Sequence, residues 1–131
     1  MRRTVHDRPL VRPEVWRHAG GGIPVVDPYV RRYWTPVLGP GAIADLLRLA
    51  TAAERRRSLP RPVYLSSLIR AGMVAIHDGA IRVRTRVPEV PRHLRHTLPP
   101  ALRRELADRP ERPFSTETQP SRSFGASKAS A

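Results

Sequence analysis

Residues 73–87 carry the feature that most constrains the fold, a tight-turn sequence between two stretches of alternating apolar and polar residues. Asp78-Gly79 is typical of two-residue hairpin turns, because both central positions of such a turn need a positive φ. Pairing the strands around this turn gathers four aliphatic side chains on one face, those of Val74, Ile76, Ile81 and Val83. The opposite face carries Ala75, His77, Arg82 and Arg84. Turn chemistry and hydrophobic pattern therefore both predict a two-stranded antiparallel ribbon with one face against a core.

Three helical segments are expected before the ribbon. Asp27-Pro28 is a helix-start signal, and the apolar spacing after it predicts a short helix that ends at Thr35-Pro36. A longer helix is predicted over residues 41–56, with Asp45 and Arg48 on the face opposite its apolar stripe. Pro62 suits the first turn of a third helix, which Gly72 ends in the left-handed conformation.

The flanks differ from this central part in composition. Residues 1–26 mix arginines with prolines and a triple glycine, which predicts a disordered basic arm in which Trp16 is a candidate docking anchor. Residues 109–131 are rich in serine and proline, which predicts a disordered tail. A single domain is therefore expected over residues 27–108. Its predicted class is α+β, mainly helical, with a three-helix core and a two-stranded antiparallel β-hairpin.

The net charge is strongly positive. Lys and Arg number 24 against 11 Asp and Glu, which gives a formal charge of +13, and all but one of the basic residues are arginine. Such a charge favours acidic macromolecules as partners and predicts binding that weakens with salt. A GC-rich genome would produce the same arginine bias without any ligand, so composition leaves both explanations open.

Several functional classes are disfavoured. The chain has no cysteine, which excludes disulfides, cysteine-ligated zinc and thiol nucleophiles. His93 and His96, with His77 as a possible third ligand, have no carboxylate or cysteine nearby to complete a metal site. The triple glycine lacks the residues of a phosphate loop, and no acidic pair suits hydrolysis. No enzyme activity, metal or cofactor is therefore expected. The absence of a signal-length or membrane-length apolar run predicts a cytoplasmic protein that does not enter a membrane.

The order of three helices and an Asp-Gly-turned ribbon resembles the winged helix-turn-helix DNA-binding domains. The segments YWTPVLGPGAIADLLRLA and LIRAGMVAIHDGAIRVRTRVP also resemble small actinobacterial proteins that carry such domains. The resemblance covers residues 28–90 and implies that the ribbon is a wing and the third helix a recognition helix. One departure is that only RRRSLPRPVY stands where a positioning helix would precede the third helix.

Three groups of residues are candidates for nucleic-acid contact. Arginines at alternate positions of the ribbon predict a row that follows phosphates or enters a minor groove: Arg82, Arg84 and Arg86. A second cluster lies between the second and third helices: Arg55, Arg56, Arg57 and Arg61. The outward face of the third helix could reach base edges through Ser66, Ser67 and Arg70. Each group has a structural alternative, since arginines also suit solvated strands and helix ends.

The sequence thus favours a small nucleic-acid-binding protein, with duplex DNA as first partner and transcription regulation as its role. Two alternatives stay open. Arginine-rich ends suit an RNA-binding or ribosome-associated protein equally well. A degenerate winged helix could also serve as a protein-interaction module whose arginines meet an acidic protein partner. The oligomeric state has no signal in the sequence.

Overall fold

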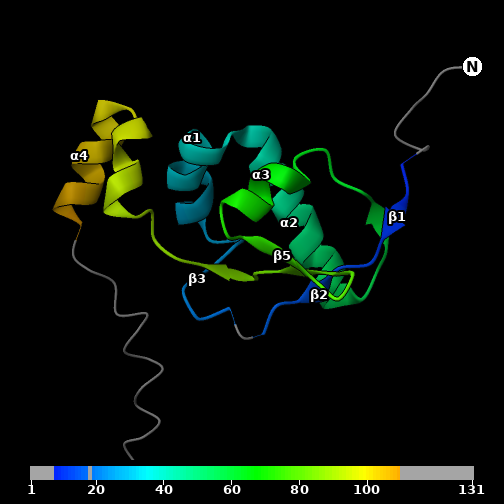
Figure 1. Cartoon of the computed structure of the whole chain (residues 1–131). Helices are drawn as coiled ribbons and strands as arrows, with labels where there is room; N and C mark the ends of the chain where they lie inside the picture. Colours follow the sequence, from blue (N-terminus) through cyan, green and yellow to red (C-terminus); the bar gives the residue numbers. More distant parts are fainter. Residues whose placement is uncertain (1–7, 18, 110–131) are drawn as a thin grey trace, which may run out of the picture.

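The structure, a computed structural model, describes residues 8–17 and 19–109. Helices lie over and beside three small sheets of very short strands (Figure 1). The helical elements are η2 (Val30–Trp34), α1 (Thr35–Leu38), α2 (Pro40–Arg55), α3 (Leu65–Arg70), η3 (Arg92–Thr97) and α4 (Pro100–Asp108). The strands are β1 (Leu10–Val11), β2 (Glu14–Val15), β3 (Ile23–Pro24), β4 (Leu59–Pro60), β5 (Val74–His77), β6 (Ala80–Val83) and β7 (Arg86–Val87).

The predicted hairpin is confirmed in position and register. β5 and β6 pair antiparallel with Ile76 opposite Ile81 and His77 opposite Ala80. Asp78 and Gly79 both have positive φ, 53° and 78°, as a tight hairpin turn requires. Burial of Ile76, however, was wrongly predicted, because its side chain is 48% exposed. Ile76 lies near the turn on the edge strand β5, whereas its buried partner Ile81 lies on the central strand β6.

Strand β6 is the centre of a three-stranded sheet. β5 pairs with one of its edges, and β2 pairs with the other edge in parallel, with Val15 opposite Val83. Helix α2 contacts both β2 and β6, and helix α3 contacts β5. The side chains of Leu46, Leu49, Leu68, Val74 and Val83 are almost completely inaccessible, so the core lies between these helices and the sheet.

The N-terminal segment differs from the predicted disordered arm of residues 1–26. Its described residues form β1, β2 and β3, which pair with β4, β6 and β7 respectively. Ile23 and Val25 are buried in the core, and burial of such side chains offsets the entropy lost on ordering the segment. Residues 1–7 of the arm and residues 110–131 of the predicted tail lie outside the described residues.

The predicted fold class is therefore wrong. The chain has a mixed α/β fold with strands in three small sheets, and not a three-helix core with one hairpin. The segment between α2 and α3 is extended, and Leu59 and Pro60 pair with the N-terminal strand β1. Pro60 and Pro62 make a helix unfavourable here, and an extended partner strand satisfies the backbone instead.

The first helix also continues beyond its predicted end at Thr35-Pro36. The π-helical turn η2 leads directly into α1, which reaches Leu38 with Pro36 in its first turn. Asp27 accepts a hydrogen bond from the Tyr29 N–H at 2.8 Å, which agrees with the predicted helix-start signal.

The Glu105 carboxylate joins helix α4 to η2. Glu105 accepts two hydrogen bonds from Arg32, at 2.9 and 2.6 Å, and a third from the Tyr33 hydroxyl at 2.6 Å. The hydrogen bonds from Arg32, followed by that from Tyr33, lower the pKa of Glu105 from 4.5 to about 2.

Among the described residues, no helix is both long and apolar enough to cross a membrane.

We expect Gly22→Ala to lower the free energy of unfolding by about 1–3 kcal/mol. Gly22 has a φ of 134°, and a Cβ there would lie 2.3 Å from the Val87 carbonyl oxygen, where β3 and β7 meet. Gly21→Ala is the control, because its Cβ would have no atom within 4 Å. Urea denaturation measures both. Equal losses for the two variants would contradict this account of Gly22.

We expect Glu105→Gln to lower the melting temperature at pH 7. The low pKa of Glu105 means that its carboxylate stabilises the fold fully above pH 4.5 and loses this effect as the pH falls toward 2. The difference in melting temperature between the variant and the parent should therefore shrink across that range. Circular dichroism melts at several pH values test this. Glu54→Gln, on the exposed side of α2, should change little at any pH.

Candidate nucleic-acid interface

The predicted cluster after α2 is divided by the structure. Arg55 is the last residue of α2, and Arg56 follows in the left-handed conformation with its N–H bonded to the Ala52 and Ala53 carbonyls. Arg56 and Arg57 are exposed, and no acidic side chain in the described part of the chain pairs with either. Arg61 lies beyond β4, where its backbone N–H donates to the Pro9 carbonyl at 2.9 Å.

The predicted row of ribbon arginines is not a row of free guanidinium groups. Strand β6 ends at Val83, so Arg84 and Arg86 lie beyond it. Arg84 donates to the Gly72 carbonyl at 3.1 Å, and Arg86 donates to the Gly22 carbonyl at 2.9 Å. The Arg82 Nε lies 3.8 Å from a Glu14 carboxylate oxygen. Sequence periodicity misses these partners because each comes from a distant segment.

The third helix carries the remaining predicted contact residues. Ser66 and Arg70 are exposed on α3, and Ser67 is half-buried. None of these three residues lines the hollows described below. Contact of these side chains with base edges stays a prediction.

A first arginine-lined hollow lies between α2 and the N-terminal segment. Its volume is about 440 Å³, and it is lined by Arg12, Pro13, Glu14, Val15, Arg17, Ala53 and Arg56. We call it the α2 hollow. Three arginines and one acidic residue, Glu14, line it, so the net charge of its lining is positive.

A second hollow lies against the exposed end of the sheet and contains a tryptophan. It measures about 210 Å³ and is lined by Val15, Trp16, Arg17, Ala19, Gly20, Arg84, Thr85 and Arg86. The backbone N–H of Trp16 donates to the Val83 carbonyl at 2.9 Å, which continues the pairing of β2 with β6. The Arg84 guanidinium lies 5.7 Å from the Trp16 ring centre, and burial lowers the pKa of Arg84. We call this the tryptophan hollow.

The two hollows share Val15 and Arg17, so they are neighbours across β2. Together they form a surface that we call the arginine band, made of Arg12, Arg17, Arg56, Arg84 and Arg86. The band joins one member of the predicted cluster after α2, Arg56, and two members of the predicted ribbon row, Arg84 and Arg86, to two residues of the N-terminal segment. Arg12 and Arg17 were missed as site residues because residues 1–26 were assigned to a disordered arm. The alternation of Val11, Pro13 and Val15 with polar residues is the signal that indicates a strand there.

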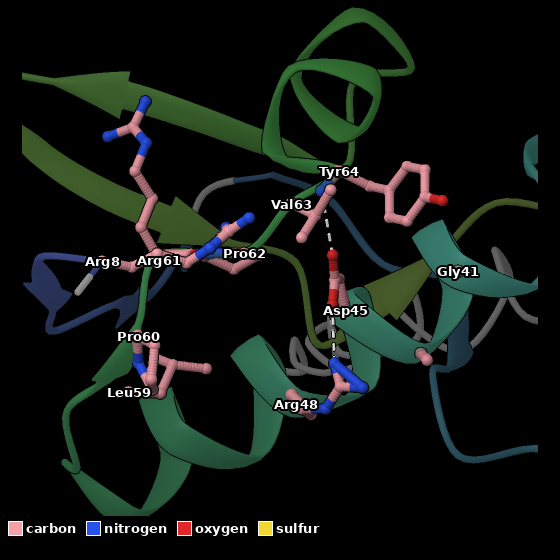
Figure 2. A pocket seen from close by; sticks show the side chains of 11 residues that line it. Arg8, Gly41, Asp45, Arg48, Leu59, Pro60, Arg61, Pro62, Val63 and Tyr64 are labelled. Carbon is pink, nitrogen blue, oxygen red and sulfur yellow. Dashed lines mark hydrogen bonds and ion pairs between the residues drawn. The ribbon is translucent and has the colours of Figure 1, made fainter. Parts of the chain in front are cut away.

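A third hollow, the apolar groove, lies between α2 and the segment that contains β4 and precedes α3. Its volume is about 470 Å³, and Figure 2 shows the residues that line it: Arg8, Gly41, Ala44, Asp45, Arg48, Leu59, Pro60, Arg61, Pro62, Val63 and Tyr64. Asp45 was predicted on the outer face of the second helix, but it is only 6% exposed. Its carboxylate accepts hydrogen bonds from the Tyr64 N–H at 2.9 Å and from Arg48 at 2.6 Å, which explains how the charge can be buried.

Near the C-terminal end of the described chain, four arginines line a further hollow of about 490 Å³: Arg92, Arg95, Arg103 and Arg109. Glu89 lines the same hollow.

No group of three potential metal-ligating side chains occurs within residues 8–17 and 19–109. His96 Nδ1 lies 2.9 Å from the His93 carbonyl oxygen.

Comparisons of the chain with protein-family models, with curated proteins and with solved structures gave no match. The resemblance to winged helix-turn-helix domains therefore stays a prediction.

We expect Arg84→Ala to lower the free energy of unfolding by about 1–2 kcal/mol, because it removes a charged hydrogen bond and a cation–π contact. The hydrogen bond joins Arg84 to Gly72, and the ring is that of Trp16. Arg82→Ala is the matched control, since its only ionic neighbour in the described chain is Glu14 at 3.8 Å, and it should cost less than about 1 kcal/mol. Urea denaturation followed by tryptophan fluorescence measures both. A larger loss for Arg82→Ala would contradict the structural role of Arg84.

Proposed function

We propose that this protein binds nucleic acid through the arginine band, with duplex DNA as its first partner. The single observation that carries the proposal is the convergence of five arginines from three separate parts of the chain on two adjoining hollows. Arginine suits this role because its planar group can donate to phosphate oxygens through several N–H groups at once.

The state of these side chains also supports the proposal. Arg12, Arg17 and Arg56 are exposed, and within the described residues none forms an ion pair. Arg86 uses one N–H on the Gly22 carbonyl, which leaves further donors for a ligand. The fold therefore holds part of the band in place and leaves charge available. The formal charge of +13 adds long-range attraction to any polyanion.

The tryptophan hollow extends this chemistry to bases. Trp16 is half-buried, Arg84 lies over its ring, and Arg17 and Arg86 line the same hollow. An aromatic ring beside guanidinium groups is the arrangement that nucleic-acid-binding proteins use for stacking next to a phosphate. We place this activity in the cytoplasm, and transcription regulation is the role that sequence-selective binding would imply.

The test is a salt titration of binding to a fluorescently labelled duplex. If the five arginines of the band neutralise five phosphates, the slope of log affinity against log salt should be about −4 to −5. The double variant Arg17→Ala/Arg56→Ala should weaken binding and reduce the slope by about 2. Arg56 is exposed at the helix end and Arg17 has no partner in the described chain, so the fold should remain intact.

The matched control removes the same charge elsewhere. Arg31 and Arg104 are exposed on η2 and α4 and line none of the four hollows. Arg31→Ala/Arg104→Ala should leave the salt slope nearly unchanged. Equal effects of the two double variants would mean that total charge alone attracts DNA and that the band has no special role. A slope of log affinity against log salt near zero for the parent protein would contradict the proposal.

Two further arms of the experiment address other partners. Structured RNA that displaces the duplex at equal nucleotide concentration would identify RNA as the preferred partner. Absence of any binding at low salt, together with nuclease-resistant association with an acidic protein, would favour the protein-interaction alternative.

A further inference from the structure

The apolar groove differs from the arginine band because apolar side chains form most of its floor. Leu59, Pro60, Pro62, Val63 and Tyr64 supply most of its lining. Val63 is 61% exposed and Tyr64 is 46% exposed, so these apolar groups face solvent. An exposed apolar floor with charged residues at its margin is typical of a binding site.

The shape of this floor is fixed by two contacts. Tyr64 lies against Gly41 so closely that a Cβ at Gly41 would be 2.4 Å from the ring. The buried Asp45 carboxylate holds the Tyr64 backbone N–H at 2.9 Å. Any side chain at position 41 of α2 would displace the Tyr64 ring. The groove is therefore formed before any ligand arrives, which lowers the entropy cost of binding.

The charges of the groove are unequally compensated. Arg48 pairs with Asp45 at 2.6 Å, so this guanidinium is largely neutralised. Arg8 donates one hydrogen bond to the Arg61 carbonyl at 2.7 Å, and no acidic group in the described chain pairs with Arg8 or Arg61. Figure 2 shows Arg8 and Arg61 toward one end of the groove and Tyr64 beside Gly41 toward the other. Positive charge is thus concentrated at one end.

We propose that the apolar groove binds a small amphipathic anion, with its anionic head at Arg8 and Arg61 and its apolar body along Pro62, Val63 and Tyr64. The volume of about 470 Å³ lies within the range of roughly 300–1,000 Å³ common for small-molecule sites. Charge complementarity at one end and an apolar floor at the other select this class of ligand. The Asp45 carboxylate is occupied by its own partners, so it does not oppose the anion freely.

A nucleotide fits this groove less well. Its base edges and sugar hydroxyls would lose water over a floor of prolines, valine and leucine that offers few hydrogen-bonding partners. The proposal therefore does not depend on nucleic-acid binding, and loss of DNA binding in any variant would leave it unaffected.

The test is isothermal titration calorimetry with three probes: decanoate, decyl maltoside and adenosine monophosphate. The two decyl probes are kept below their micelle-forming concentrations. Decanoate should bind with one site per chain, and at least about tenfold more tightly than the uncharged maltoside. Equal affinity for the two decyl probes, tighter binding of the nucleotide, or no decanoate binding at millimolar concentration would overturn the proposal.

Variants separate the two ends of the site. Arg61→Ala and Arg8→Ala/Arg61→Ala should each weaken decanoate binding by about tenfold or more and leave maltoside binding unchanged. Arg61 is exposed and its guanidinium has no partner in the described chain, so the single variant should fold normally. Val63→Asp should weaken the binding of both decyl probes, because it places a carboxylate on the exposed floor of the groove.

The double variant Arg31→Ala/Arg104→Ala again provides the control for total charge, and it should bind decanoate as the parent does. Unchanged decanoate affinity in Arg61→Ala or in Val63→Asp would show that the anion binds elsewhere. Either result would overturn the assignment to this groove.

Discussion

The pairing of both edges of β6 is the constraint on which the rest of the structure depends. β5 reaches β6 through a two-residue turn, whereas β2 comes from a segment more than 60 residues away in sequence. The parallel pairing of β2 holds Trp16 and Arg17 beside Arg84 and brings Arg12 next to the end of α2. Without this contact the arginine band would not exist, because its members belong to three separate segments. The fold thus builds the arginine band from its longest-range sheet contact.

Local signals in the sequence were sufficient for some elements and not for others. The hairpin register followed from Asp78-Gly79 and strand alternation, and α2 followed from its apolar stripe, because each pattern is contained in one short segment. The pairs β1 with β4 and β3 with β7 involve two residues on each side, too few for a periodic signal. Tertiary burial, as at Ile23 and Val87, stabilises the pair of β3 with β7, and local propensity does not.

The candidate site was only partly predictable for the same reason. Arg56, Arg84 and Arg86 were identified from clustering, but their neighbours Arg12 and Arg17 lie in a segment whose proline and glycine content indicated disorder. Asp45 was placed on the solvent side of its helix because periodicity treats every charge as exposed. The extended segment before α3 covers that face, and the Tyr64 N–H and Arg48 compensate the buried carboxylate.

The arginine bias itself can be explained by more than genome composition. A small chain of formal charge +13 is destabilised by repulsion between like charges. Four arginines offset this by donating to backbone carbonyls: Arg8 to Arg61, Arg84 to Gly72, Arg86 to Gly22 and Arg95 to Val90. Three of these bonds join segments at least 12 residues apart. A guanidinium has five N–H donors in a fixed plane, so it can hold a carbonyl and still present donors to a ligand, which a lysine ammonium does less well. Base composition can account for the number of arginines, but their contacts give them a structural role.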